Sequence, residues 1–87
     1  MALSQQELDK YLGELLHSDG GAYMAEEIRA KWFNGYTEYQ IQQALNRCIT
    51  EGSIISRYNG NAGQYRLYSA NFAYYGSRLI NSVWRKV

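Results

Sequence analysis

The sequence predicts a small α+β domain that is mainly helical, with three helices, then a β-hairpin, and an additional C-terminal helix. Apolar residues recur at helical spacing in four segments, which predicts the helices. After Gly52 the pattern changes to short runs of β-branched and aromatic residues, which predicts the hairpin. The 87 residues include no proline, low-complexity tract or internal repeat, so we expect one core and no second independent domain.

The first predicted helix covers residues 5–17. Ser4 and Glu7 have the spacing of a capping box, in which each side chain bonds the backbone amide of the other residue. The turn sequence SDGG at residues 18–21 ends the helix. Its predicted apolar stripe is Leu8, Tyr11, Leu12, Leu15 and Leu16.

A shorter second helix is predicted in the stretch AEEIRAKWF, residues 25–33. Acids in its first turn and a base near its end match the helix dipole. Residues 22–24, which precede it, are expected to form an edge strand or an extended lead-in. Residues 34–36 close the helix and lead the chain to Thr37.

The third predicted helix runs from Thr37 to Glu51. Thr37 and Gln40 form a second capping box, and Gly52 supplies the positive φ that commonly ends a helix. One side is apolar: Ile41, Ala44, Leu45, Cys48 and Ile49. The opposite side is polar and rich in forked amide and guanidinium groups: Tyr39, Gln43, Asn46, Arg47 and Thr50, flanked by Gln40 and Gln42.

Two interpretations of this polar side are open. Forked donors and acceptors match base edges in the DNA major groove, which makes the segment a candidate recognition helix. The alternative is a solvated face built from good helix formers, because Gln and Arg both have high helix propensity.

Two strands, residues 53–58 and 64–68, are predicted to form a hairpin around the tip at residues 59–63. Arg57 and Arg66 flank this tip. From Asn71 a further amphipathic helix is predicted, with an apolar stripe of Phe72, Tyr75, Leu79, Ile80, Val83 and Trp84.

Composition limits the classes of function. One cysteine allows no internal disulfide, and one histidine beside it gives no zinc framework, so we expect no metal and no cofactor. Cys48 is expected to be a buried structural thiol. No leader sequence and no run of about 20 apolar residues is present, so we expect a soluble, cytoplasmic protein that does not enter a membrane.

Charge is distributed unevenly along the chain. Residues 1–51 carry eight acids and four bases, a balance of −4, whereas residues 52–87 carry five bases and no acid, a balance of +5. Such asymmetry suggests that the C-terminal half faces an anion such as phosphate, or that solubilising charges are simply placed unevenly.

The order of elements resembles the winged helix-turn-helix superfamily over residues 4–68. The phrase LNRCITEGSI, with Leu45, Cys48, Gly52 and Ile54, is similar to the frequent junction of that superfamily between recognition helix and wing. The segment QYRL, residues 64–67, resembles the close of its wing. The resemblance implies a winged-helix domain at residues 1–69, followed by a C-terminal helix at residues 70–87 that packs on the domain or mediates dimerisation.

The resemblance also implies binding residues. In the third helix they are Tyr39, Gln40, Gln43, Asn46 and Arg47, which would approach bases or nearby phosphates. In the wing they are Arg57, Asn59, Asn61 and Arg66. A dimer interface would use Leu79, Ile80, Val83 and Trp84, and the alternative is that these residues fold back over the core.

The leading hypothesis is a small protein that binds double-stranded DNA, a transcriptional regulator or phage-type accessory factor, with the helix Thr37 to Glu51 in the major groove. The alternative is a winged-helix protein-interaction module that does not touch DNA. A continuous positive stripe joining Arg47, Arg57 and Arg66 would favour DNA, and an exposed Tyr, Trp and Leu patch would favour protein. A more remote option is single-strand or RNA binding by tyrosine stacking. We see no catalytic constellation and no small-molecule substrate, so we expect no enzyme.

Overall fold

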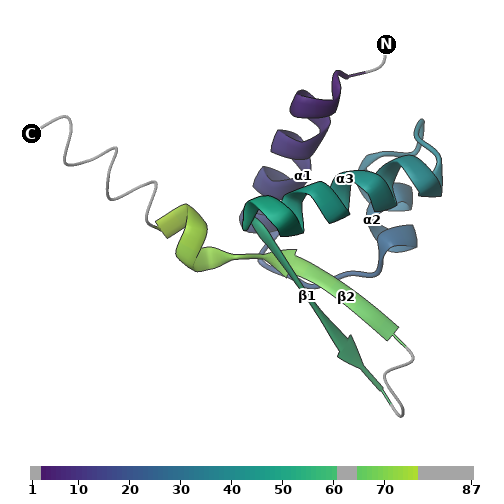
Figure 1. The fold of residues 1–87 in the computed structure, drawn as a ribbon. Coiled ribbons are helices and arrows are strands. Elements are labelled where there is room, and N and C mark those ends of the chain that lie inside the picture. The colour runs from purple at the N-terminus through teal and green to yellow at the C-terminus, as the bar shows by residue number, and fades with distance from the viewer. Residues whose placement is uncertain (1–2, 61–64, 77–87) are drawn as a thin grey trace, which may run out of the picture.

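The computed structural model describes residues 3–60 and 65–76. Three helices are followed by a two-stranded antiparallel hairpin (Figure 1): α1 Gln5–Asp19, α2 Ala25–Trp32, α3 Glu38–Glu51, β1 Ile54–Asn59 and β2 Tyr65–Ala70. Residues 72–76 form a further helical turn. This arrangement confirms the predicted fold class, a mainly helical winged helix with additional C-terminal helical structure.

Local signals in the sequence set the ends of the helices. The capping boxes at Ser4 and Thr37 are both present, and Gly20 and Gly52 end α1 and α3 with φ of 83° and 102°. As a result α3 lies where it was predicted, while α1 extends two residues beyond residue 17. The predicted stripe of α1 was wrong at Tyr11, which is 45% exposed, because the buried side of the helix follows Leu8, Leu12 and Leu16, spaced by four residues, and Tyr11 lies beside that line.

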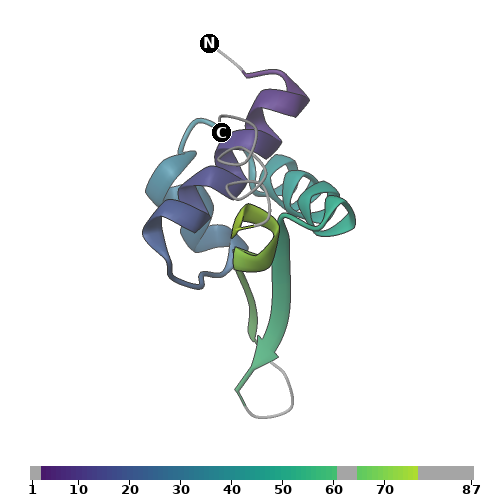
Figure 2. The ribbon, with the colours of Figure 1, turned by 90° about the vertical axis from the view of Figure 1, so that its left-hand side faces the viewer.

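The core lies where the three helices meet the base of the hairpin. Leu12, Leu16, Ile28, Ile41 and Leu45 are at most 1% exposed, as is Ile54 at the start of β1. Cys48 is also fully buried, as predicted, and burial raises the pKa of its thiol to about 11. The hairpin extends away from this helical body like a wing (Figures 1 and 2).

The register of the hairpin runs from the pair Ile54 and Ala70 to the pair Asn59 and Tyr65. Asn59 therefore belongs to β1 and not to the tip, a correction of one residue. Tyr23 forms a single bridge to β2, with Tyr23 N donating to Tyr68 O at 2.9 Å and Tyr68 N donating to Tyr23 O at 2.7 Å. Residues 22–24 are thus an extended lead-in that pairs with the sheet at one point.

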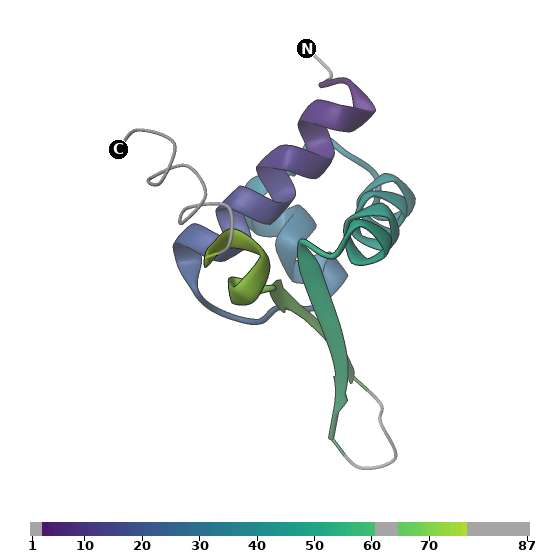
Figure 3. The ribbon, with the colours of Figure 1, turned by 60° about the vertical axis from the view of Figure 1, so that its left-hand side comes forward.

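The helical turn at residues 72–76 packs beside α1 (Figure 3). The ring of Tyr75 stacks on His17 with centroids 4.5 Å apart, and Phe72 lies 5.3 Å from the same imidazole. The Asn71 side chain donates to the carbonyl of Gly52 at 2.8 Å, which ties this turn to the start of the wing. Leu79, Ile80, Val83 and Trp84, the predicted dimer residues, lie outside the described residues.

Candidate nucleic-acid interface

Helix α3 presents a polar face that the other described elements leave uncovered. The residues that point away from the core are Tyr39, Asn46 and Thr50, which are exposed, and Gln43, which is half-buried. Tyr39 is 72% exposed. This outward face carries no charge, and its amides and hydroxyls can both donate and accept hydrogen bonds.

The flank of α3 that faces the wing is organised by Gln42, which sequence reasoning did not include in the site. Its side-chain amide donates to the hydroxyl of Tyr68 at 2.8 Å and to Oδ1 of Asn46 at 3.2 Å. Tyr68 is 2% exposed and belongs to β2, so this bond joins α3 to the wing. The spacing of Gln42 and Asn46 was visible in the sequence, but the contact with Tyr68 spans 26 residues.

The flank that faces α1 holds Arg47 and Gln40. Arg47 forms a bidentate ion pair with Asp9, with Nε to Oδ2 at 2.9 Å and Nη2 to Oδ1 at 3.0 Å. The hydrogen bond to Asp9 raises the pKa of the Arg47 guanidinium further above its ordinary value. Gln40 Oε1 accepts from Thr37 N at 2.9 Å within the capping box. Arg47 therefore leans toward α1, and Gln40 is held at the start of α3.

The two wing arginines lie on opposite faces of the hairpin. Arg66 is paired with Tyr58, and Arg57 with Leu67, and paired residues share a face while neighbours alternate. The Arg66 guanidinium bonds Ser56 Oγ at 3.2 Å and lies 5.2 Å from the ring centroid of Tyr68. The side chain of Arg57 is exposed and has no ion pair or hydrogen bond within the described residues.

Arg47, Arg57 and Arg66 consequently do not form one positive stripe. The first is neutralised by Asp9, and the other two point to different sides of the wing. Asn59, another predicted wing residue, is exposed and accepts a bond from Gly60 N at 2.9 Å. Asn61 lies outside the described residues.

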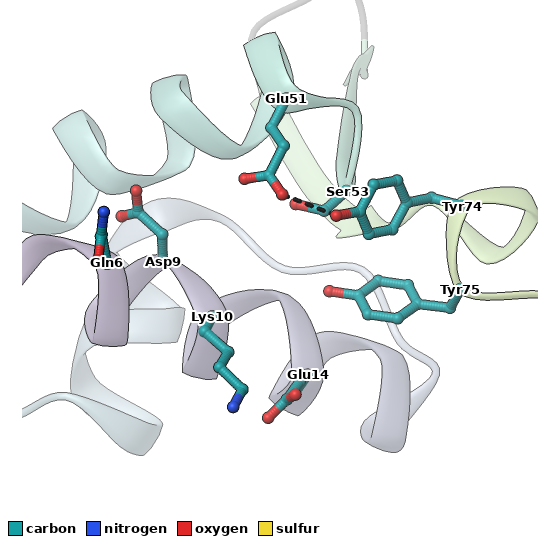
Figure 4. A pocket seen from close by; sticks show the side chains of 8 residues that line it. All are labelled: Gln6, Asp9, Lys10, Glu14, Glu51, Ser53, Tyr74 and Tyr75. Atoms are coloured by element: carbon teal, nitrogen blue, oxygen red, sulfur yellow. Dashed lines mark hydrogen bonds between the residues drawn. The ribbon is translucent and has the colours of Figure 1, made fainter. Parts of the chain in front are cut away.

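Hollows of similar size border α3, and their charges differ. One of about 320 Å³ lies between α1, the end of α3 and residues 74–75, and its lining includes Asp9, Glu14 and Glu51. Figure 4 shows Tyr74 and Tyr75 pointing into it, with the Tyr74 hydroxyl donating to Glu51 at 2.7 Å. Another, of about 310 Å³, lies between α2, α3 and the wing and is lined by Glu26, Glu38 and Arg66, among others.

The hollow on the α1 flank of α3 has a different lining. It measures about 320 Å³ and lies between the start of α1, the turn before α3 and α3 itself. We call it the α1–α3 groove; it is lined by Leu3, Gln5, Leu8, Tyr36, Tyr39, Gln40, Gln43 and Arg47. Of these three hollows it is the one with no acid in its lining.

The described residues contain no group of three His, Cys, Asp or Glu side chains placed to hold a metal ion. Within the same residues, no helix is both long enough and apolar enough to cross a bilayer.

Comparison with known proteins places the fold. No protein-family model matches the chain, and no curated protein matches it by sequence. The structure is similar, with a TM-score of 0.64, to a solved structure from work on HOP2. That work describes the DNA recognition and protein interaction domains of HOP2 and its homologous DNA pairing properties. The match covers 74% of this chain and 98% of that one, with 18% of residues identical. At that identity the likeness concerns the winged-helix fold, which the element order had predicted.

Proposed function

We propose that this domain binds double-stranded DNA by placing α3 in the major groove. The observation that carries the proposal is the outward face of α3. None of the other described elements covers this face, which presents Tyr39, Gln43, Asn46 and Thr50. An α-helix fits the major groove, and the amides of Gln and Asn can bond the edge of adenine in a bidentate manner. The likeness to the HOP2 structure supports the winged-helix framework for such binding.

The wing supplies further contacts in this proposal. Arg57 is exposed, and Arg66 is held in place by Ser56 and by the rings of Tyr58 and Tyr68. With Asn59, these are the proposed contacts to the DNA backbone, Arg57 and Asn59 from one face of the hairpin and Arg66 from the other. The bond between Gln42 and Tyr68 fixes the wing relative to α3, so that both can address one duplex without prior rearrangement.

Transcriptional regulation is the proposed role. It requires that DNA be bound at selected sequences, and the few cations of this surface predict that a single copy binds weakly. A dimer through Leu79, Ile80, Val83 and Trp84 remains the proposed means of adding affinity and spacing.

A second candidate function is a protein-interaction module, and the wing carries the observation that favours it. The face of the hairpin opposite Arg66 includes Ile55 at 48% exposure, Tyr65 at 51% and the half-buried Leu67 of β2, beside Arg57. Apolar residues gathered on one exposed sheet face are suited to a protein partner. Because Arg47, Arg57 and Arg66 do not form one continuous positive stripe, the charge distribution also favours a protein partner.

Duplex binding measured by fluorescence anisotropy separates the two functions. We expect a labelled 20-base-pair duplex to bind at low salt, and Gln43→Ala with Asn46→Ala to weaken binding to a matched site by about 30-fold or more, because each of the two lost base contacts contributes about 1–3 kcal/mol there. Gln6→Ala on α1 is the control, since it removes an exposed amide that lines a different hollow from Gln43. Equal affinities for the α3 variant, the control and the wild type would refute the role of α3. Absence of duplex binding would favour the protein-interaction module.

A further inference from the structure

The α1–α3 groove lies directly beside the outward face of α3 and has the chemistry of an anion site. Tyr39 and Gln43 belong to both surfaces, so a duplex seated on the outward face would pass over the groove. Its lining contains one cation and no acid. This contrasts with the hollow on the wing side of α3, where Glu26 and Glu38 accompany Arg66.

Three hydrogen-bond donors line the groove in fixed positions. The Tyr36 hydroxyl accepts from Leu3 N at 2.8 Å, which leaves its own proton for another acceptor. Gln40 Oε1 is occupied by Thr37, so its amide nitrogen remains as the donor. Arg47 uses Nε and Nη2 on Asp9, and its Nη1 has no partner among the described residues.

Asp9 holds Arg47 without closing the groove. Asp9 lines the neighbouring hollow of Figure 4, while Arg47 lines the α1–α3 groove. The bidentate pair fixes the plane of the guanidinium, so little side-chain entropy remains to be lost when an anion binds its open edge. Arg47 is thus oriented in advance even though its net charge is locally balanced.

The remainder of the lining suits a sugar-phosphate chain. The half-buried Leu3 provides an apolar surface for deoxyribose, and the amides and hydroxyls around it are among the side chains that commonly bond phosphate oxygens. An acidic peptide would also meet the donors, but it would gain nothing from the adjoining base-reading face.

We infer that the α1–α3 groove holds a phosphodiester strand of the duplex, with Arg47, Gln40 and Tyr36 as its phosphate contacts, and that Glu38, on the other flank of α3, stands clear of this strand. This inference rests on the proposed function. It makes Arg47 a backbone contact rather than a base contact, and it adds Tyr36 to the residues predicted from the sequence.

The test compares salt dependence of duplex binding on the two flanks of α3. Arg47→Gln is made in an Asp9→Asn background, because removing Arg47 alone would leave the Asp9 carboxylate unpaired. In this background we expect Arg47→Gln to reduce the slope of log K against log[salt] by about 0.9. At 0.15 M salt, that loss corresponds to about a fivefold weaker complex. Gln5→Lys, which adds a cation to the groove lining, should increase affinity and slope by similar amounts, and this variant does not depend on tolerating a lost contact.

Glu38→Gln is the matched variant on the wing side. At 0.15 M salt, charges beyond about 8 Å are screened, so we expect this variant to change affinity less than twofold. If Glu38→Gln strengthens binding about fivefold while Arg47→Gln and Gln5→Lys leave the slope unchanged, the strand lies on the wing side and the inference is wrong. If the wild-type protein binds no duplex at any salt concentration, the proposed function itself fails, and the inference fails with it.

Discussion

Gly13 occupies an interior position of α1 where a neighbouring side chain, and not the helix, requires glycine. A Cβ at Gly13 would overlap the hydroxyl oxygen of Tyr75 and would lie 3.4 Å from Tyr75 Cζ and 3.6 Å from Ser53 Oγ. Burial in this seat raises the pKa of Tyr75 to about 12. We therefore predict that Gly13→Ala displaces Tyr75 from α1.

The magnitude follows from two opposing effects. Gly to Ala inside a helix ordinarily stabilises by about 0.8–1 kcal/mol. Displacing Tyr75 loses its stacking on His17, at a centroid distance of 4.5 Å and worth about 0.5–1.5 kcal/mol, and also exposes part of the ring. Overpacked sites typically lose about 1–3 kcal/mol in all, so we expect Gly13→Ala to destabilise the protein by about 1 kcal/mol.

Urea unfolding followed by circular dichroism on four proteins measures this effect: the wild type, Gly13→Ala, Tyr75→Ala and the double variant. In the Tyr75→Ala background no tyrosine hydroxyl lies against Gly13, so Gly13→Ala should stabilise the protein by about 1 kcal/mol. The difference between its effects in the two backgrounds is a coupling of about 2 kcal/mol. If Gly13→Ala has the same effect in both backgrounds, within about 0.5 kcal/mol, Tyr75 does not occupy this seat and the reasoning is refuted.

Three further predictions concern single groups. Because burial raises the pKa of Cys48 to about 11, the native thiol should react with a disulfide reagent at pH 8 far more slowly than the urea-unfolded thiol; equal rates would contradict its burial. Burial raises the pKa of Tyr75 from its ordinary value of 10 to about 12, so the unfolded state loses the phenol proton at a lower pH than the folded state. The wild type should therefore lose more stability than Tyr75→Phe as pH rises from 10 to 12. Parallel stability profiles of the two proteins over this range would contradict the prediction. Thr37→Ala removes the oxygen that accepts from Gln40 N at 3.1 Å and should cost about 1 kcal/mol in urea unfolding; Thr50→Ala, whose hydroxyl bonds Asn46 O within the helix, is the control, and equal losses would contradict the capping role.

The features that could be predicted from the sequence are those set by near neighbours in the chain. Ser4 with Glu7 and Thr37 with Gln40 are three residues apart, and each pair forms the bonds that its spacing indicates. The buried face of α3 was predictable for the same reason, because helical periodicity fixes which side chains share a side. The hairpin was predicted to within one or two residues at its described ends.

Features that depend on tertiary contacts were not accessible in this way. The partner of Arg47 lies 38 residues earlier, and nothing near Arg47 in the sequence indicates Asp9. Arg57 and Arg66 were treated as one flanking pair, but their faces depend on the strand register, which a one-residue shift would reverse. The role of Gly13 became visible only with Tyr75 packed against it.

The most direct test of the central claim is titration of the ¹⁵N-labelled protein with a random duplex at low and moderate salt, observed through amide and side-chain NMR shifts. We expect perturbations on the outward face of α3, at Tyr39, Gln43 and Asn46, together with Arg57 in the wing, decreasing as salt rises. Unchanged shifts for these residues at saturating duplex, or changes confined to surfaces away from α3 and the wing, would contradict DNA binding through α3.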